Sequence, residues 1–193
     1  MTRIARSFGI TLAAGVAAVG IAVLPAVSAS AATAVTNDYG ASLSVSGPAS
    51  VVTDGPGALH GVSDGSVTVT GTGSGFDGDA QGRGFGVYVV YGPKQADYAT
   101  NSGWFGSAQW VSKSAFTAGG GFTTTIDVAK SYTADPHHTG DAAATVSCDY
   151  DATKTATANA ALGQYECFVQ TFSAHGVAND PVDLDEVQVP VTW

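Results

Sequence analysis

Alternation in the last quarter of the chain limits the fold more tightly than any other feature. Two runs, one beginning at Cys167 and the other covering residues 187–193, alternate apolar and polar residues, as strands with one buried face do. The only other cysteine, Cys148, precedes Cys167 by nineteen positions, so a single disulfide is available, with two free thiols as the alternative. We expect the disulfide, which implies an oxidising compartment and contributes about 3 kcal/mol by restricting the unfolded chain.

The N-terminus has the layout of a secretory signal peptide. Arg3 and Arg6 precede an apolar run over residues 8–24, and small residues occupy the −3 and −1 positions of a cleavage point after Ala31. The run approaches the roughly 20 residues that span a bilayer, so an uncleaved anchor is the alternative. We expect residues 1–31 to be cleaved as a signal peptide and the product to be secreted, either free or associated with the cell surface.

The remaining 162 residues are strongly acidic, with five basic residues against sixteen carboxylates and a formal net charge of −11. Nucleic-acid binding depends on cationic side chains that displace counterions from phosphates, and anionic lipid surfaces attract side chains of the same sign. We therefore expect no nucleic-acid partner and, after cleavage, no membrane partner.

Residues 32–40 show no periodicity and are interpreted as a flexible mature N-terminus, whereas short strands separated by glycine-rich turns follow. The β-branched and aromatic runs are 43–45, 66–70, 85–91, 103–111, 122–128, 168–172 and 187–193. They predict an all-β domain over residues 41–193, an immunoglobulin-like β-sandwich of about seven antiparallel strands. Pro190 makes the last strand an edge or near-edge strand, and the Ala- and Thr-rich residues 151–162 are interpreted as a loop extension inside the disulfide.

Several segments resemble one family of secreted proteins. The sequence Gly-Val-Ser-Asp-Gly-Ser-Val-Thr-Val-Thr-Gly at 61–71 resembles a strand of the neocarzinostatin-like apoproteins, which are actinobacterial carriers of enediyne chromophores. Residues 167–169, 174–176 and the terminal Val-x-Val-x-Val-x-Trp resemble the closing hairpin of the same family. Residues 86–93 and 172–176 resemble more closely the secreted actinobacterial immunoglobulin-like domains of this superfamily, which often accompany haem-uptake modules.

The resemblance covers about residues 41–193 and implies the sandwich fold together with a ligand cleft. Two departures lie near that cleft. The apoproteins have a second disulfide after the strand at 86–93, where this chain has no cysteine, and the disulfide loop is longer here. The resemblance therefore implies the fold rather than the cargo, and we assign no chromophore-contacting residue.

Two glycine motifs imitate enzyme sites without the structural context that those sites need. Residues 61–65 fit G-x-S-x-G, but a nucleophile elbow needs a helix after the serine, and the residues after Ser63 alternate as a strand. Residues 73–78 fit G-x-G-x-x-G, but the strand that follows cannot place a helix N-terminus at a pyrophosphate. We therefore expect no catalytic residue and no enzyme, with a secreted hydrolase as the alternative.

Candidate metal ligands are equally incomplete. Asp77 and Asp79 open like an EF-hand loop, but Tyr88 occupies the twelfth position, where that loop has a bidentate carboxylate. The histidine pair at 137–138 points in opposite directions on an extended segment, and haem ligation by His175 is implied only by the resemblance. We expect no bound metal and no cofactor. Looser calcium binding is the alternative for the aspartates of these loops, Asp77, Asp79, Asp180, Asp183 and Asp185.

Aromatic residues crowd into positions 88–116. Tyr88 and Trp110 fit core positions by their strand context, while other rings suit an apolar cleft of the kind that binds small molecules. On a regular strand Trp104 and its neighbour Phe105 face opposite ways, which predicts Trp104 in the cleft and Phe105 in the core. Ordinary packing of all these rings is the alternative. The tentative ligand-binding residues are Trp104, Tyr91, Tyr98 and Phe116.

Together these observations predict a secreted, non-catalytic binding module whose ligand is an apolar small molecule or a cell-surface component. Two alternatives come from the resemblance: a carrier of an enediyne-type chromophore that takes part in antibiotic action, and an accessory in haem acquisition. A secreted hydrolase is the alternative from a different class.

Overall fold

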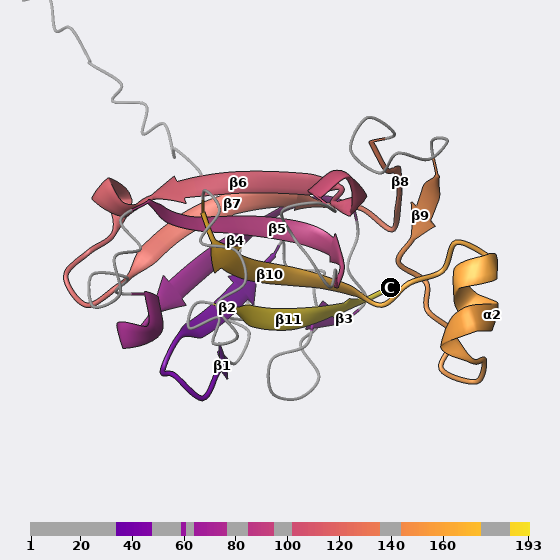
Figure 1. The fold of residues 1–193 in the computed structure, drawn as a ribbon, viewed down its shortest axis with the longest axis horizontal. Coiled ribbons are helices and arrows are strands. Elements are labelled where there is room, and N and C mark those ends of the chain that lie inside the picture. Colours follow the sequence, from indigo (N-terminus) through magenta and orange to yellow (C-terminus); the bar gives the residue numbers. More distant parts are fainter. Residues whose placement is uncertain are drawn as a thin grey trace, which may run out of the picture.

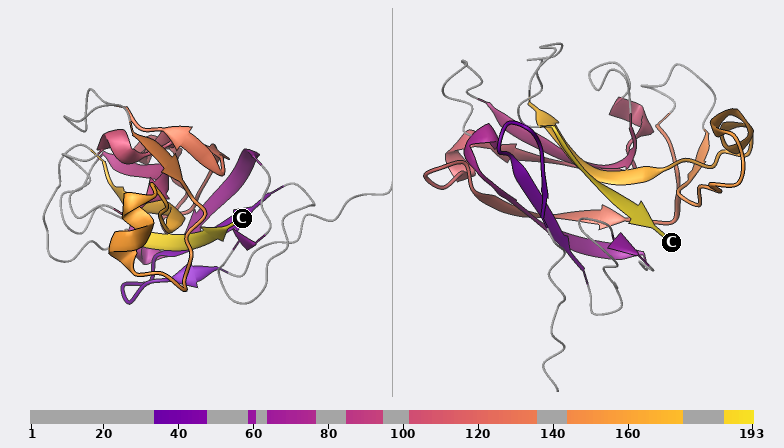
Figure 2. Two further views of the ribbon diagram at one scale, coloured as in Figure 1. Left: turned by 90° about the vertical axis from the view of Figure 1, so that its right-hand side faces the viewer. Right: turned by 90° about the horizontal axis from the view of Figure 1, so that it is seen from below.

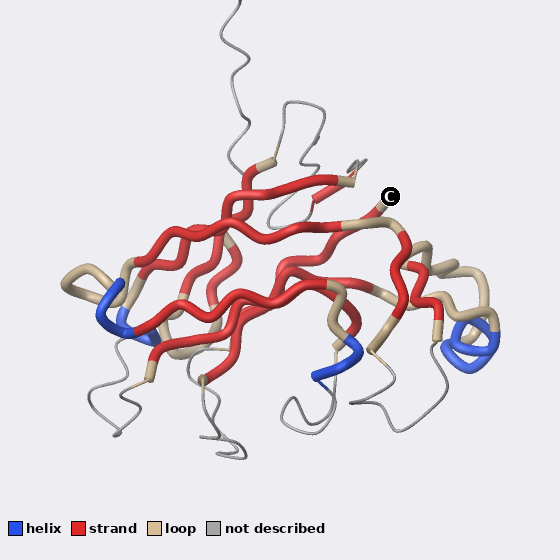
Figure 3. The backbone as a smooth tube through the Cα atoms, turned by 90° about the horizontal axis from the view of Figure 1, so that it is seen from above, coloured by secondary structure: helices blue, strands red, loops and turns tan. Residues whose placement is uncertain are grey.

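The structure is a computed structural model that describes residues 34–47, 59–60, 64–76, 85–94, 102–135, 144–174 and 186–193. Most of its regular structure is strand, which confirms the all-β prediction (Figure 3). The strands are β1 (Val35–Thr36), β2 (Ser42–Ser46), β3 (Leu59–His60), β4 (Gly65–Thr72), β5 (Gly86–Pro93), β6 (Ser107–Ser112), β7 (Phe122–Val128), β8 (Ser131–Thr133), β9 (Thr145–Ser147), β10 (Cys167–Ser173) and β11 (Val187–Thr192).

These strands form two large sheets and one small one (Figure 1). A four-stranded sheet has the order β1-β2-β4-β7, and a five-stranded sheet has the order β3-β11-β10-β5-β6. Neighbouring strands in both sheets are antiparallel, except that β3 runs parallel to β11. β8 and β9 form a separate antiparallel pair. Because β11 has only the two-residue β3 outside it, the near-edge position predicted from Pro190 is confirmed.

The inward faces of the two large sheets share one hydrophobic core, and Figure 2 shows the sheets as facing layers. Alternate residues are buried in β2 and β4, as expected for strands that have one solvated face. Full burial of a valine or leucine side chain contributes roughly 1.5–3 kcal/mol, so the aliphatic residues are the main source of stability. Those at the centre of the core include Leu43, Val45, Val67, Val69, Val87, Val89, Val169 and Val189.

The predicted runs all lie on strands, but the run at 103–111 needs a correction. Its first part is not extended, because Ser102–Trp104 forms a short 3-10 helix, η3, and β6 begins only at Ser107. Gly106 separates the two, and a Cβ atom at this position would lie 2.8 Å from the ring of Tyr132. A residue larger than glycine at position 106 would therefore clash with the Tyr132 ring unless that ring moved.

A second correction concerns residues 151–162, which contain a short helix rather than only a loop. The helix, α2, covers Ala156–Ala161, and the Thr155 hydroxyl caps it by accepting a hydrogen bond from the N–H of Ala158 at 3.2 Å. Asn159 is fully buried, and its side-chain amide donates to two backbone carbonyls of the preceding turn. Alanine's helix propensity and this buried amide together explain the helix.

The predicted disulfide is confirmed. Cys148 and Cys167 are bonded, with their Cα atoms 5.3 Å apart. The bond closes residues 149–166, which we call the disulfide lobe, and this lobe lies with β8 and β9 at one end of the sheets (Figure 1). Two further 3-10 turns, η1 (Ser74–Phe76) and η4 (Lys113–Ala115), complete the helical structure of the described residues. No helix within the described ranges has the length and apolarity to cross a membrane.

Candidate functional site

A row of aromatic side chains crosses the outer face of the five-stranded sheet, the face turned away from the core. The strand register places Tyr88 of β5 beside Trp110 of β6 and Phe172 of β10. The ring centroids of Tyr88 and Phe172 lie 5.6 Å apart. Val87 and Val89, which flank Tyr88, belong to the core cluster, whereas the three aromatic residues do not. Alternation along the strands therefore turns this row outward.

The row ends at an exposed indole on β6, the last strand of the sheet. Trp110 is 45% exposed, and Phe85, directly before β5, is 53% exposed. The indole N–H of Trp110 donates to the backbone carbonyl of Phe85 at 3.0 Å. This hydrogen bond satisfies the only polar group of the indole, so its ring presents an apolar surface of fixed orientation.

A stacked pair of rings lies across the middle of the same face. The ring centroids of Phe105 and Phe172 are 5.9 Å apart and their planes differ by 29°. Phe105 lies between η3 and β6. It is held beside the Tyr91 end of β5, because the N–H of Gly106 donates to the carbonyl of Tyr91 at 2.9 Å. Between the two ends, Val90 and Gln170 are at most 1% exposed although they point away from the core. The centre of the outer face is therefore shielded from solvent, whereas the side formed by Trp110 and Phe85 is exposed.

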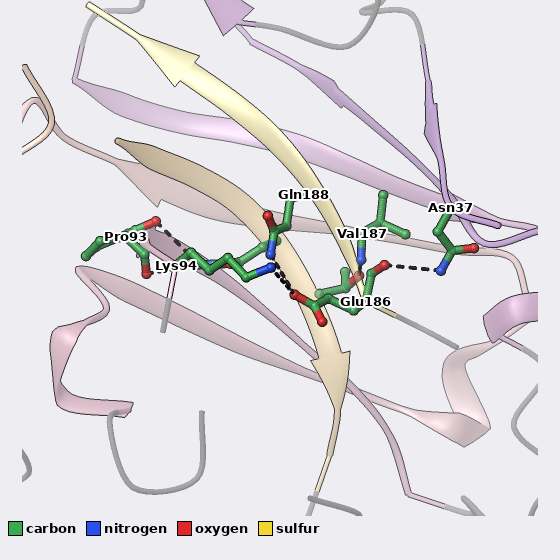
Figure 4. Close-up of polar contacts among 9 residues, drawn as sticks. Asn37, Pro93, Lys94, Glu186, Val187 and Gln188 are labelled. Atoms are coloured by element: carbon green, nitrogen blue, oxygen red, sulfur yellow. Dashed lines mark hydrogen bonds and ion pairs between the residues drawn. The ribbon is translucent and has the colours of Figure 1, made fainter. Parts of the chain in front are cut away.

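Polar side chains line one side of this face (Figure 4). The carboxylate of Glu186 accepts a hydrogen bond from Gln188 Nε2 at 2.6 Å and lies 3.3 Å from Lys94 Nζ. Asn37 Nδ2 donates to the backbone carbonyl of Glu186 at 3.1 Å, and Gln170 Nε2 donates to the carbonyls of Gly92 and Pro93. The aromatic surface thus has a fixed border of amide and charged groups, the composition expected of a small-molecule site.

Two of the predicted ligand-binding residues lie away from this face. Tyr91 is 1% exposed in the core, where its hydroxyl donates to the carbonyl of Ala129 at 2.9 Å. Burial raises the pKa of Tyr91 well above its usual range, so its phenol remains a hydrogen-bond donor. Trp104 is half-buried, with its ring centroid 5.9 Å from that of Tyr165 in the disulfide lobe, and its carbonyl accepts a hydrogen bond from Tyr132.

Of the other two, only Phe116 is among the described residues. Phe116 packs on Phe122, with ring centroids 5.3 Å apart, beside the core. Tyr98 lies outside the described residues. The structure therefore does not bring the described members of the predicted set together, and it places a different aromatic group on the outer face.

Three assignments to the core are corrected. Trp110 is exposed, and its neighbour Val111 faces the core instead, at 5% exposure. Tyr88 and Phe105 are only partly buried and contact Phe172 on the outer face. Alternation with the buried valines of β5 and β6 turns Tyr88 and Trp110 outward. Phe105 lies between η3 and β6, outside the regular strand, so strand alternation does not fix its face. Parity within β10, where Phe172 alternates with buried residues, is the signal that identifies the residue omitted from the prediction.

Among the described residues, no group of three or more His, Cys, Asp and Glu side chains is placed to hold a metal ion. Several motif residues considered above lie outside the described ranges, namely Ser63, Asp77, Asp79, His137, His138, His175, Asp180, Asp183 and Asp185.

No model of a known protein family, no curated protein and no solved structure matches this chain.

Proposed function

We propose that this protein is a secreted, non-catalytic binding module that holds a planar apolar small molecule against the outer face of the five-stranded sheet. The observation that carries the proposal is the aromatic row of Trp110, Tyr88 and Phe172 on that face. At one side of this row Trp110 and Phe85 are 45% and 53% exposed, and exposed aromatic surface next to further rings is available for a ligand. Stacking on fixed rings favours a flat ligand.

We extend the proposal to the fold type, an immunoglobulin-like sandwich, and to secretion from the cell. Two mainly antiparallel sheets around one core, with a strand within each predicted run, support an immunoglobulin-like sandwich of the neocarzinostatin-like type. The disulfide supports an oxidising compartment, which agrees with secretion directed by residues 1–31.

The alternative that the same observation favours is a carrier of an enediyne-type chromophore. A polycyclic cargo needs the stacking surface that Trp110 and Phe172 supply, and the polar border around Glu186 would orient it. The two proposals differ in the identity of the ligand and not in the location of the site.

The test is a fluorescence titration with Nile red, a neutral polycyclic dye that the acidic protein does not repel. We expect Trp110→Ala to weaken binding about ten-fold, because losing one stacked ring removes roughly 1–1.5 kcal/mol. The variant should remain folded, since Trp110 is 45% exposed and lies outside the core cluster.

Tyr39→Ala is the matched control, because Tyr39 is similarly exposed, at 47%, but lies in the turn before β2. Equal loss of affinity in the control, or unchanged affinity in Trp110→Ala, would place the site elsewhere. A panel of esters and peptides run on the same proteins addresses the remaining class: turnover that disappears in Ser63→Ala would favour the hydrolase alternative.

A further inference from the structure

A concave feature lies beside the disulfide, at the end of the five-stranded sheet away from Tyr88 and Phe172. It is an open pocket of about 340 Å³ formed where three segments meet: residues 148–152, 166–168 and 190–193. The start of β10 and the end of β11 form one wall, and the beginning and end of the disulfide lobe form the rest. This volume is within the range of small-molecule sites.

The lining of this pocket combines aromatic rings with carboxylates. Tyr150, Phe168 and Trp193 supply the rings, and Asp149 and Glu166 supply the carboxylates. None of the lining residues is basic. Aromatic faces attract cations through the ring quadrupole, and carboxylates attract them directly. The lining therefore favours a cation over an anion.

The disulfide is the reason that two like charges are held at one pocket. Asp149 directly follows Cys148, and Glu166 directly precedes Cys167. Both acidic residues are therefore next to cysteines whose Cα atoms are 5.3 Å apart. The backbone reinforces this closure, because the N–H of Tyr165 donates to the carbonyl of Ser147 at 2.8 Å. Covalent closure of the lobe therefore keeps both carboxylates at the same pocket.

One of the two carboxylates already has a cationic neighbour. Lys130 Nζ lies 3.3 Å from Asp149 Oδ2, with both side chains about half exposed. An exposed pair of this kind is screened by solvent and contributes little to stability. Its position shows that this part of the surface accepts a positive charge, and the −11 charge of the chain after residue 31 attracts further cations.

We propose that this pocket binds a small organic cation, an alkylammonium or quaternary ammonium group that also carries apolar surface. The cationic head contacts the rings of Tyr150, Phe168 and Trp193, and Glu166 and Asp149 balance its charge. The site is separate from the aromatic row and does not depend on the function proposed for that face.

The test compares choline with 3,3-dimethylbutan-1-ol, its uncharged isostere, by NMR titration of the folded, oxidised protein. We expect choline to shift the indole resonance of Trp193 and to bind at least about ten-fold more tightly than the isostere. Affinity for choline should fall as salt is added. Equal binding of the two compounds, or no binding of choline up to about 10 mM, would overturn the proposal.

Two variants locate the charge. Glu166→Gln keeps the shape of the side chain and should weaken choline binding about five-fold, the effect of one unit charge at about 4 Å in water. Asp38→Asn is the control, because it changes the net charge equally at an exposed position in the turn before β2. An equal loss in both variants would show a general effect of the protein's field and would exclude a specific pocket.

Discussion

Gly71 and Phe122 form a pair whose substitution should show opposite effects in two backgrounds. They face each other across β4 and β7. A Cβ atom at Gly71 would lie 2.1 Å from Cε1 and 2.5 Å from Cζ of the Phe122 ring. The ring cannot simply move aside, because its centroid is 5.2 Å from that of Phe76 and 5.3 Å from that of Phe116.

The magnitude follows from this geometry. Overpacking by one methyl group costs about 1–3 kcal/mol, whereas alanine in place of glycine gains about 0.4–1 kcal/mol through the unfolded chain. We therefore expect Gly71→Ala to lower the free energy of unfolding by about 1–2 kcal/mol, which lowers Tm by roughly 2–8 °C in a domain of this size. Phe122→Ala should cost about 3–5 kcal/mol, because it leaves a cavity beneath the two neighbouring rings.

In the Phe122→Ala background the sign should reverse. The new methyl group at Gly71 then enters vacated space, so Gly71→Ala should be neutral or stabilising by up to about 1 kcal/mol. The coupling energy of the cycle should be about 1–3 kcal/mol. Urea unfolding of the four proteins with the disulfide intact measures all the terms. If Gly71→Ala destabilises equally in both backgrounds, the ring of Phe122 is not what excludes a side chain at this position.

Three further outcomes are expected. Replacing both Cys148 and Cys167 by serine should cost about 3 kcal/mol in urea unfolding, from the closure of a loop with a sequence separation of 19, and no change would contradict that entropic origin. The pKa of Asp151 is lowered first by its hydrogen bond to Lys154, so this contact stabilises the fold above the ordinary pKa of about 3.9 and is lost as pH falls through the lowered value. An NMR titration of the Asp151 carboxyl should therefore have a midpoint well below the ordinary aspartate pKa of about 3.9, and Lys154→Met should raise that midpoint. The secreted protein should begin at or near Ala32 and be two hydrogens lighter than its reduced form, whereas a membrane-retained full-length chain in intact-mass analysis would contradict cleavage.

The sequence carries enough information to predict the strands because alternation is local. The runs at 122–128 and 187–193 match β7 and β11 closely, because their buried residues fall at alternate positions: Val187, Val189 and Val191 in β11, and Phe122, Ile126 and Val128 in β7, where Thr124 is half-buried. The disulfide was equally accessible, because a chain with two cysteines has one possible pair. Propensity alone was less informative at α2, where the buried contacts of Asn159 select the helix.

The candidate site was harder to predict because it depends on parity and register between strands. Because Ser102–Trp104 forms a 3-10 helix and β6 begins only at Ser107, alternation counted from residue 103 does not give the faces of Trp104 and Phe105. The contact between Phe105 and Phe172 joins residues that no local pattern relates. The pocket beside the disulfide likewise combines three separate segments, so spacing along the chain gives no indication of it.

The disulfide lobe leaves the sheets and returns to them at two points whose Cα atoms are 5.3 Å apart. Any segment whose ends meet that separation could be grafted in its place, and doubling its length would add only about 0.6 kcal/mol of closure entropy. The disulfide lobe can thus be replaced by another segment, in evolution or by design, without a change in the sheets. The aromatic row on the five-stranded sheet contains no residue from the lobe, so it would pass unchanged through such an exchange.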